Sequence, residues 1–483
     1  MDRRIIMDIE AFLNADKSIV IAPAGYGKTY TIAEAIASYQ GCKKVLVLTH
    51  THAGIASLKE KFDQRELLPS KYHLDTICSF ALELTKTYHL NKEEIPSEND
   101  TKAMFSYAIQ PAKLILQAKP IQYLMGINYE HLIVDEYQDC TVAQHKLIME
   151  LSKTLKTHIL ADPLQSIFGF GNEQIVDFND RTFEPFHVNS QTLDTPWRWQ
   201  NAGQDLLGRD LSLIRNKLLN NEDINLSEYP SVEFYNEPSD GYTQPGSQYK
   251  RKIFEVLNDE SVLLIHPISQ NPLARVKFIQ QFPQLRMIES IDDKSIYEYC
   301  DLFDSMEGEG LVKTVVDMMK ALAKTSAITK WFNTQGKIIK KQKQTEKEVS
   351  DSLVNAITPL LSNKTFSGVL NLIDAISGLP DMRIYRKSIL FDIKCTLRDA
   401  ERLGITAKEA IIRNRNIVRR RGRKIIGKSI GTTLLTKGLE FDTVVVLNAH
   451  QFDNPKHLYV ALTRCCNRLV VITNNPVLHP YPE

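Results

Sequence analysis

Residues 23–29 bring together glycine, lysine and threonine in the order that phosphate binding requires. Two glycines let backbone N–H groups approach a phosphate, the lysine reaches its terminal oxygens, and the threonine hydroxyl can bind Mg²⁺. A helix that starts directly after such a loop adds a favourable dipole. We therefore expect a nucleoside triphosphate and Mg²⁺ to be held by Ala24, Gly25, Tyr26, Gly27, Lys28 and Thr29.

A pair of carboxylates supplies the second half of this chemistry. Asp135 and Glu136 directly follow the apolar residues 131–134. Asp135 is suited to hold Mg²⁺, usually through water. Glu136 is suited to polarise the attacking water, because phosphoryl transfer depends mainly on positioning and charge stabilisation. An exposed acidic strand end is the alternative interpretation, and the phosphate loop upstream favours the catalytic one.

Strands and helices must alternate if these groups are to meet at one edge. Apolar runs at 19–22, 44–49, 131–134 and 157–160 predict buried strands, each followed by polar residues. Such a pattern is typical of a parallel sheet that binds its ligand along the carboxyl ends of its strands.

A second region of the same type begins near Phe183. Core strands are predicted there at 262–266, 443–447 and 469–473. Both regions are interrupted by stretches with helical periodicity and little strand character, and we expect these to be insertions. They cover about 81–128, with breaks at Pro96, Pro111 and Pro120, and about 295–425.

The composition is that of a soluble globular protein. The 483 residues carry a net charge of +1, with 43% hydrophobic and 24% charged residues. No segment approaches the roughly 20 apolar residues of a membrane span. Seven cysteines without a CxxC spacing favour reduced thiols in the cytoplasm and argue against a zinc or iron–sulfur site.

Basic residues are concentrated in one run near the C-terminal third. We favour contact with a polyanion for this run, with a solvated helix face as the alternative. Its members are Arg413, Arg415, Arg419, Arg420, Arg421, Arg423, Lys424 and Lys428.

Eight elements in order, including the phosphate loop, resemble the motifs of UvrD/Rep-type superfamily 1 DNA helicases and span nearly the whole chain. Asp135-Glu-Tyr-Gln-Asp139 is similar to their DEFQD/DEYQD signature. The other six are Thr49-His-Thr-His-Ala-Gly54 (TFTNKAA), Asp75-Thr-Ile-Cys-Ser-Phe80 (GTxHSF), Asp162-Pro-Leu-Gln-Ser-Ile-Phe-Gly-Phe170 (DxxQSIYxW), Pro196-Trp-Arg198 (NYR), Thr432-Thr-Leu-Leu-Thr-Lys-Gly-Leu-Glu-Phe441 (TxHxAKGLEF) and Tyr459-Val-Ala-Leu-Thr-Arg464 (YVxxTRA).

The resemblance implies roles around the nucleotide. Gln165 would sense the γ-phosphate, and Arg198 and Arg464 would neutralise charge on the transferred phosphoryl group from the opposite domain. An arginine fork suits this because it pairs bidentately with phosphate. Trp197 would stack on adenine and Glu440 would accept from the ribose hydroxyl. Taken alone, Trp197 would be a core aromatic and Arg198 a surface ion pair.

The resemblance also implies a single-stranded DNA track of stacking platforms and phosphate contacts. Phe170 stands where relatives stack a tryptophan on a base, and His50, Thr51, Thr76 and Thr432 lie in elements that line the strand path.

The chain departs from the family pattern at several positions. No glutamine precedes the phosphate loop to read adenine, which leaves the purine selectivity open. Tyr30, Gly171 and Leu434 replace residues that are Arg, Arg and His in the family motifs. The inserts are short, and such a compact helicase resembles the helicase subunit of Gabija-type antiviral systems, which works beside an OLD-family (ABC ATPase/TOPRIM) nuclease.

The predicted fold class is α/β, with two RecA-like P-loop NTPase domains at residues 1–180 and 181–483, each with a short helical insertion. The predicted function is an ATP-dependent DNA helicase or translocase of UvrD-like type, acting in repair or anti-phage defence. It would move 3′→5′ by family resemblance, on single-stranded DNA and on tailed or forked duplexes. The alternative is a DNA-sensing ATPase subunit that activates a partner nuclease with little unwinding of its own.

Overall fold

The computed structural model of this protein describes residues 7–482 except 89–100, 169–173, 268–271, 291–292, 342, 422–424 and 426. The chain forms two compact units. The first unit comprises Met1–Ser239, Arg421–Arg423 and Thr436–Glu483, and the second comprises Asp240–Arg420 and Lys424–Leu435. This division follows packing and does not coincide with the predicted boundary between residues 180 and 181, which stays a prediction.

A six-stranded parallel sheet forms the core of the first unit, in the order β3-β2-β4-β5-β1-β6. The predicted central strands are present because strands buried on both faces are nearly continuous apolar runs. Ile19 of β1, for example, pairs with Ile159 of β5, and each side chain is at most 1% exposed. The strands are β1 (Lys17–Ile21), β2 (Lys44–Thr49), β3 (Tyr72–Thr76), β4 (Tyr129–Val134), β5 (Lys156–Ala161) and β6 (Ser190–Thr192).

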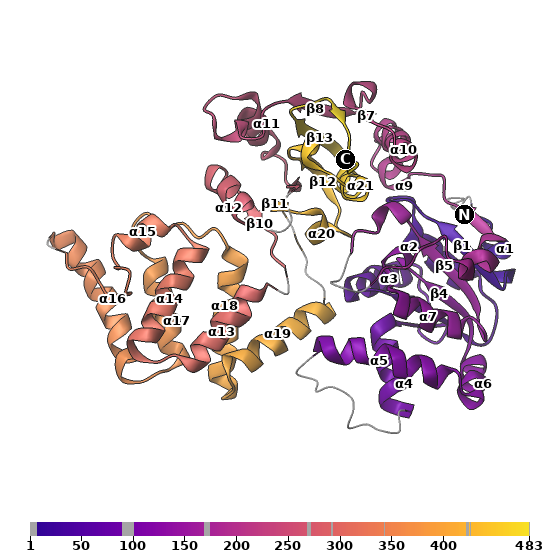
Figure 1. Cartoon of the computed structure of the whole chain (residues 1–483), viewed down its shortest axis with the longest axis horizontal. Helices are drawn as coiled ribbons and strands as arrows, with labels where there is room; N and C mark the ends of the chain where they lie inside the picture. Colours follow the sequence, from indigo (N-terminus) through magenta and orange to yellow (C-terminus); the bar gives the residue numbers. More distant parts are fainter. Residues whose placement is uncertain are drawn as a thin grey trace. The chain divides into compact units, whose positions relative to one another are not determined.

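Eleven helices of the described residues belong to this unit, and the connections between the strands run through several of them (Figure 1). They are α1 (Ile9–Asn14), α2 (Lys28–Ser38), α3 (His52–Gln64), α4 (Ile77–Tyr88), α5 (Thr101–Leu116), α6 (Lys119–Asn128), α7 (Val142–Leu151), α8 (Glu184–His187), α9 (Trp197–Asn201), α10 (Asp205–Leu219) and α21 (Pro455–Leu462).

The first predicted insertion is helical, through α4, α5 and α6. The expected break at Pro111 is wrong, because this proline lies inside α5. One lost backbone hydrogen bond is outweighed there by packing, since Ala108, Ile109 and Ala112 are buried in the core of the unit. Pro120 lies in the first turn of α6, where the chain does start a new helix, and Pro96 lies outside the described residues.

Three more parallel strands complete the first unit, and two of them come from the C-terminal part of the chain. They are β8 (Val232–Asn236), β12 (Phe441–Val446) and β13 (Cys465–Thr473), in the order β12-β13-β8. A small antiparallel pair joins β7 (Ile224–Asn225) to β14 (Val477–Leu478). The predicted phosphate loop and residues 436–483 therefore share one unit.

The second unit combines three short parallel strands with a helical bundle. The strands are β9 (Val262–Ile265), β10 (Arg286–Met287) and β11 (Lys428–Gly431), in the order β10-β11-β9. Its helices are α11 (Gln248–Val256), α12 (Pro272–Gln281), α13 (Lys294–Ser305), α14 (Gly308–Leu322), α15 (Thr325–Thr329), α16 (Gln344–Ser362), α17 (Phe366–Ser377), α18 (Lys387–Leu403) and α19 (Ala407–Arg421). A short turn, α20 (Thr433–Thr436), follows β11.

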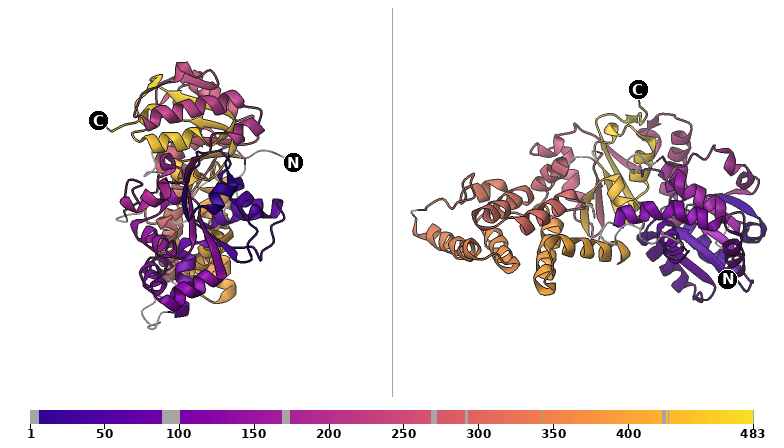
Figure 2. Two further views of the ribbon diagram at one scale, coloured as in Figure 1. Left: turned by 90° about the vertical axis from the view of Figure 1, so that its right-hand side faces the viewer. Right: turned by 60° about the horizontal axis from the view of Figure 1, so that its bottom comes forward.

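The helices from α13 to α19 confirm the helical character predicted for about 295–425 (Figure 2). Their apolar faces meet in one core, in which Val315, Met319, Leu372 and Ile393 are fully buried. The strands and this bundle are linked by Arg386, whose guanidinium donates to both carboxylate oxygens of Glu289 at 2.9 and 2.8 Å.

The basic run does not form one solvated surface. Arg415 is only 3% exposed and pairs with Asp392 at 3.0 Å, so the expectation that it contacts a polyanion is wrong. Burial requires such a charge to be paired inside the protein. Arg413 is exposed on the same helix, and Arg423 and Lys424 lie outside the described residues.

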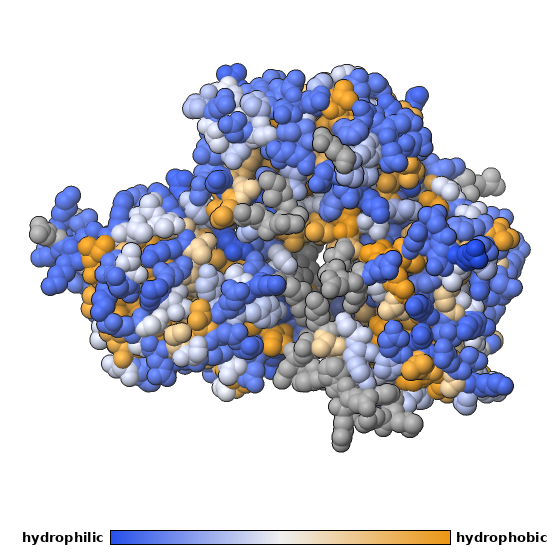
Figure 3. Space-filling model, in the orientation of Figure 1, coloured by the Kyte–Doolittle hydropathy of each residue, from blue (hydrophilic) through white to orange (hydrophobic). Residues whose placement is uncertain are grey.

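Hydrophilic side chains cover most of the face seen in Figure 3. In the part of the chain that the structure describes, no helix has the length and apolar character needed to cross a membrane.

Candidate nucleotide site

The loop between β1 and α2 has the backbone that the sequence predicted for a phosphate cradle. Gly25 and Gly27 have φ of +79° and +84°, values that favour glycine. A Cβ atom would lie 2.9 Å from the Trp199 ring at Gly25 and 3.1 Å from Trp197 at Gly27. Glycine is required at both positions, since indole rings close over the loop. Lys28 and Thr29 then begin α2.

The two carboxylates lie opposite this loop, at the carboxyl end of β4. The amide of Glu136 donates to Asp135 Oδ1 at 2.9 Å, and Glu136 itself has φ of +54°. A non-glycine residue in this region is strained, and such strain is concentrated at functional sites. Lys28 Nζ lies 3.5 Å from Asp135 and forms an ion pair with Glu136.

Burial and charge act differently on the two acids. Burial is the main effect on Asp135 and raises its pKa, against the opposing charge of Lys28. Burial also acts to raise the pKa of Glu136, but the charges of Lys28 and Lys437 outweigh it and lower the pKa. Glu136 is therefore held as a carboxylate, the form that can accept a hydrogen bond from water.

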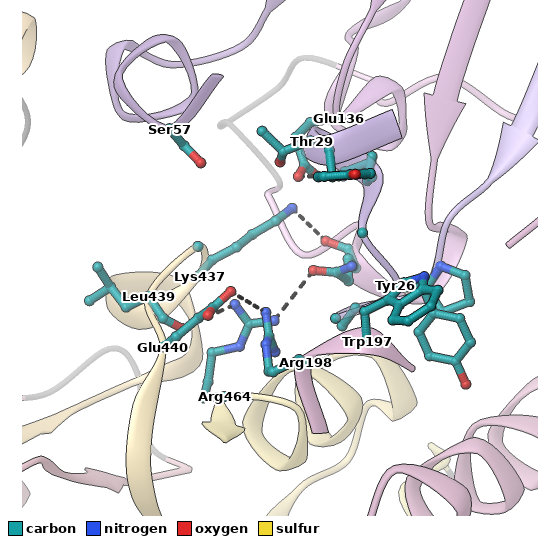
Figure 4. A pocket seen from close by; sticks show the side chains of 18 of the residues that line it. Tyr26, Thr29, Ser57, Glu136, Trp197, Arg198, Lys437, Leu439, Glu440 and Arg464 are labelled. Carbon is teal, nitrogen blue, oxygen red and sulfur yellow. Dashed lines mark hydrogen bonds and ion pairs between the residues drawn. The ribbon is translucent and has the colours of Figure 1, made fainter. Parts of the chain in front are cut away.

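Two arginines from distant parts of the chain enter the same site. Arg198 is on α9 and forms an ion pair with Glu440 at 2.5 Å, and it also donates to the carbonyl oxygen of Thr463. Arg464 directly follows α21 and Thr463, and it is 2% exposed. Its burial, together with the charge of Arg198, lowers its pKa to about 10. Figure 4 shows both arginines beside Glu440.

Gln165 connects Arg464 to the buried Asp162. Its side-chain amide donates to Asp162 Oδ2 at 2.9 Å, and Arg464 approaches its oxygen at 3.4 Å. Asp162 also accepts from Arg215 at 3.0 Å, and its own amide donates to Gln138 at 3.0 Å. A movement of Gln165 would therefore change its contacts with both Asp162 and Arg464.

Lys437 is a further buried cation of this site. Its Nζ donates to the two carboxylate oxygens of Asp139 at 2.7 and 2.5 Å and to the carbonyl oxygen of Gln165 at 2.5 Å. It also lies 4.5 Å from the centre of the Phe168 ring. Burial lowers the pKa of Lys437 and raises that of Asp139 to about 7, and the charge of each partner opposes the effect of burial on the other.

These groups surround one cavity of about 780 Å³, a size suited to a nucleotide. All of its lining residues belong to the first unit. The predicted residues that line it are Ala24, Gly25, Tyr26, Gly27, Lys28, Thr29, Asp135, Glu136, Gln165, Trp197, Arg198, Glu440 and Arg464, together with His50 and Thr51.

The donor set fits Mg²⁺ with a triphosphate. Hydroxyl and carboxylate oxygens of Thr29 and Asp135 are the hard ligands that Mg²⁺ prefers. Figure 4 shows Thr29 beside Glu136, so hydroxyl and acids face the same space.

The residues predicted to contact DNA are more dispersed. His50 lies against Cys140 Sγ at 3.3 Å, and burial followed by the charge of Lys437 lowers its pKa to about 4. The Thr51 hydroxyl caps α3, and the buried Thr76 hydroxyl donates to Ser79 at 2.8 Å. Thr432 is buried in the second unit, and Phe170 lies outside the described residues.

Several residues of the site were given no role by the sequence. Four of them lie within the motifs quoted above, and this position was the feature of the sequence that could have identified them as site residues. They are Asp139, Asp162, Lys437 and Tyr459. The Tyr459 hydroxyl accepts from the amide of Ala24 at 3.1 Å and so fixes the phosphate loop. Trp199, Ser212 and Arg215 carried no signal, because their roles depend on packing between segments far apart in sequence.

Comparison with known proteins gives a family match for the N-terminal part alone. Residues 7–171 match the family model described as an AAA domain. No curated protein matches the chain.

Two helicases are among the similar solved structures. An arterivirus nonstructural protein 10 (helicase), in complex with DNA, is 10% identical with a TM-score of 0.34, and the match covers 96% of this chain. The chain spans 62% of that protein, less than two thirds of its length. The Pif1 helicase from Candida albicans is 13% identical with a TM-score of 0.36, over 98% of this chain and 95% of that one.

Proposed function

We propose that this protein is an ATP-hydrolysing DNA helicase or translocase that uses Mg²⁺. The observation that carries the proposal is the convergence of Lys28, Glu136, Gln165, Arg198 and Arg464 on one cavity. A lysine, an ionised acid and two arginines are the groups that phosphoryl transfer needs, and the AAA-domain match to residues 7–171 supports nucleotide binding.

The residues of the cavity have different roles in ATP binding and hydrolysis. Loop amides and Lys28 hold the phosphates, and Thr29 and Asp135 hold Mg²⁺, which neutralises phosphate charge. Glu136 orients the attacking water and accepts its proton. Lys28 is paired with Glu136 and Arg198 with Glu440, so a bound triphosphate exchanges these internal partners for its own oxygens. Trp197, beside Gly27, stacks on the base.

The finer assignment rests on the resemblance of the sequence motifs. We propose UvrD-like action with 3′→5′ movement on single-stranded DNA. The proposed DNA contacts are His50, Thr51, Thr76, Phe170 and Thr432, of which His50 and Thr51 line the cavity. We also propose, from the same resemblance of sequence motifs, that the protein acts in a Gabija-type system beside an OLD-family nuclease.

The alternative is a DNA-sensing ATPase that activates a partner nuclease with little unwinding. The exposed Leu434 favours it, because an apolar side chain stands where the family has a histidine. Tyr30 favours it too, because it stands at the position where the family often has an arginine. The centre of its ring lies 4.4 Å from the guanidinium of Arg65.

The test is steady-state ATP hydrolysis by the full chain, with and without single-stranded DNA, and strand separation on duplexes tailed at 3′ or 5′. Lys28→Ala is the inactivating variant and Lys59→Ala, at an exposed lysine of α3, is the matched control. DNA-stimulated hydrolysis with separation of the 3′-tailed duplex supports the helicase, and stimulation without separation supports the sensor. Hydrolysis that survives in Lys28→Ala contradicts both.

A further inference from the structure

The edge strand β3 carries a cluster of metal-ligating side chains outside the nucleotide cavity. His73 and Asp75 are two residues apart on β3, so both side chains lie on one face of the sheet. Glu83 is on α4, the next element of the chain. Ligand atoms of the three residues all lie within 4.8 Å of one another. In the described ranges no other trio of His, Cys, Asp or Glu has this spacing.

The spacing is close to that of ligands around one ion and becomes equal to it with a small side-chain rotation. Transition ions bind nitrogen and oxygen ligands at about 2.0–2.2 Å, so ligands on opposite sides of one ion are up to ~4.4 Å apart. No ion pair within the described part of the chain joins His73 to either carboxylate. The exposed side chain of Glu83 can close the small remaining difference by rotation.

Two of the three residues are already oriented by their neighbours. Nδ1 of His73 lies 2.6 Å from the hydroxyl of Tyr129, and the two rings stack with centroids 5.9 Å apart. The carboxylate of Asp75 accepts from the amide of Thr76 at 2.7 Å. Histidine and carboxylate ligands of metal ions are commonly held by such outer partners, which limit the entropy lost on binding.

We propose that His73, Asp75 and Glu83 bind a divalent first-row transition ion. One imidazole and two carboxylates form a mixed nitrogen–oxygen set that accepts Mn²⁺ or Zn²⁺ and leaves positions for water. The ion ties the edge strand β3 to α4. Thr76 lies between the ligands in sequence and caps α4, so the ion stiffens this segment. The proposal does not depend on the proposed function, because it concerns metal binding without nucleotide.

The test is a titration of the chelator-treated full chain with Mn²⁺ in the absence of nucleotide. Binding is measured as the loss of the free-ion signal in electron paramagnetic resonance. Mn²⁺ is the better probe because thiolates of the seven free cysteines would also take up Zn²⁺. We expect one ion per chain. Glu83→Gln should weaken binding by about tenfold or more, and His73→Gln should weaken it further.

Two controls make the result specific. Glu60→Gln changes an exposed glutamate of the neighbouring helix α3 and should bind Mn²⁺ like the unmodified protein. Asp135→Asn removes the acid of the nucleotide site and should also leave this binding intact. Melting curves in chelator check that each variant folds. Absence of Mn²⁺ binding, equal binding by Glu83→Gln, or loss of binding in Asp135→Asn would each overturn the proposal.

Discussion

At the scale of single residues, the cavity depends on contacts that only glycine permits. Gly25 and Gly203 both have positive φ, of +79° and +71°, but only Gly25 has a side chain pressed against it. Gly25→Ala should lower the free energy of unfolding of the first unit by about 2–4 kcal/mol, from backbone strain and the clash with Trp199. It should also abolish nucleotide binding.

Gly203→Ala is the matched control for this prediction. No heavy atom lies within 4 Å of the added Cβ, so only the strain of about 1–2 kcal/mol remains. Urea unfolding and binding of a fluorescent ATP analogue measure both effects. Equal losses in the two variants would show that the indole ring does not constrain the loop.

The buried pair of Lys437 and Asp139 gives a second prediction at this scale. Their side chains are 7% and 3% exposed, so removing one partner leaves an uncompensated buried charge. Lys437→Met and Asp139→Leu should each cost about 3–5 kcal/mol, and the double variant should cost clearly less than their sum. Urea unfolding of the four proteins measures this coupling.

The exposed pair Lys313 and Asp317 provides the comparison. Its members are 51% and 44% exposed, and their coupling should be under about 1 kcal/mol. Additive losses at Lys437 and Asp139 would mean that the pair is not formed in solution.

At the scale of elements, a chain of buried histidines crosses the sheet. Nδ1 of His158 on β5 lies 2.8 Å from Ser18 Oγ on β1, and Nε2 lies 3.0 Å from His131 Nδ1 on β4. Burial is the main cause that lowers the pKa of His131 to about 4, and burial also lowers that of His158. Both rings are neutral in the folded state at neutral pH.

The sign of the resulting pH dependence follows from these shifts. Between the unfolded pKa of about 6.5 and the folded value, the unfolded chain binds more protons. Stability is therefore complete above about pH 6.5 and falls as the pH drops toward 4, by up to ~1.4 kcal/mol per pH unit for each histidine. His131→Gln should reduce the difference in urea midpoint between pH 7 and pH 5. An unchanged difference would contradict this.

The same scale shows how far the sequence predicts the fold. The strands β2 and β4 were predictable because each contains a run of buried apolar residues, 45–48 and 132–134. The edge strand β3 was not predicted, since Tyr72, His73 and Asp75 are polar and only the partner strand reveals their extended backbone. Motif residues of the cavity were predictable by type and order. Arg215 and Trp199 were not, because their partners Asp162 and Cys465 lie far away in sequence.

At the scale of the whole molecule, ligand binding should stabilise one unit selectively. The cavity lies within the first unit, so ATP analogue and Mg²⁺ should raise the melting temperature of that unit only. At a ligand concentration of 100 Kd the gain is about 2.7 kcal/mol. Trp331 belongs to the second unit, so Trp331→Phe leaves fluorescence that reports on the first unit through Trp197 and Trp199.

Lys28→Ala should remove this shift and Lys59→Ala should preserve it. A shift of equal size in hydrogen exchange across both units would contradict the assignment of the site to one unit.

The first unit is built from both ends of the chain, and this has a consequence for synthesis on the ribosome. Trp199 donates to the carbonyl oxygen of Cys465 at 3.0 Å, and Arg464 is a wall of the cavity. About 200 residues separate Ser239 from Thr436, which at ~5–20 residues per second take roughly 10–40 s to translate. A nascent chain therefore carries the phosphate loop but lacks the part of the cavity wall formed by Lys437, Glu440 and Arg464 throughout that interval. We expect the nascent chain to bind and hydrolyse ATP only after residues 436–483 have left the exit tunnel.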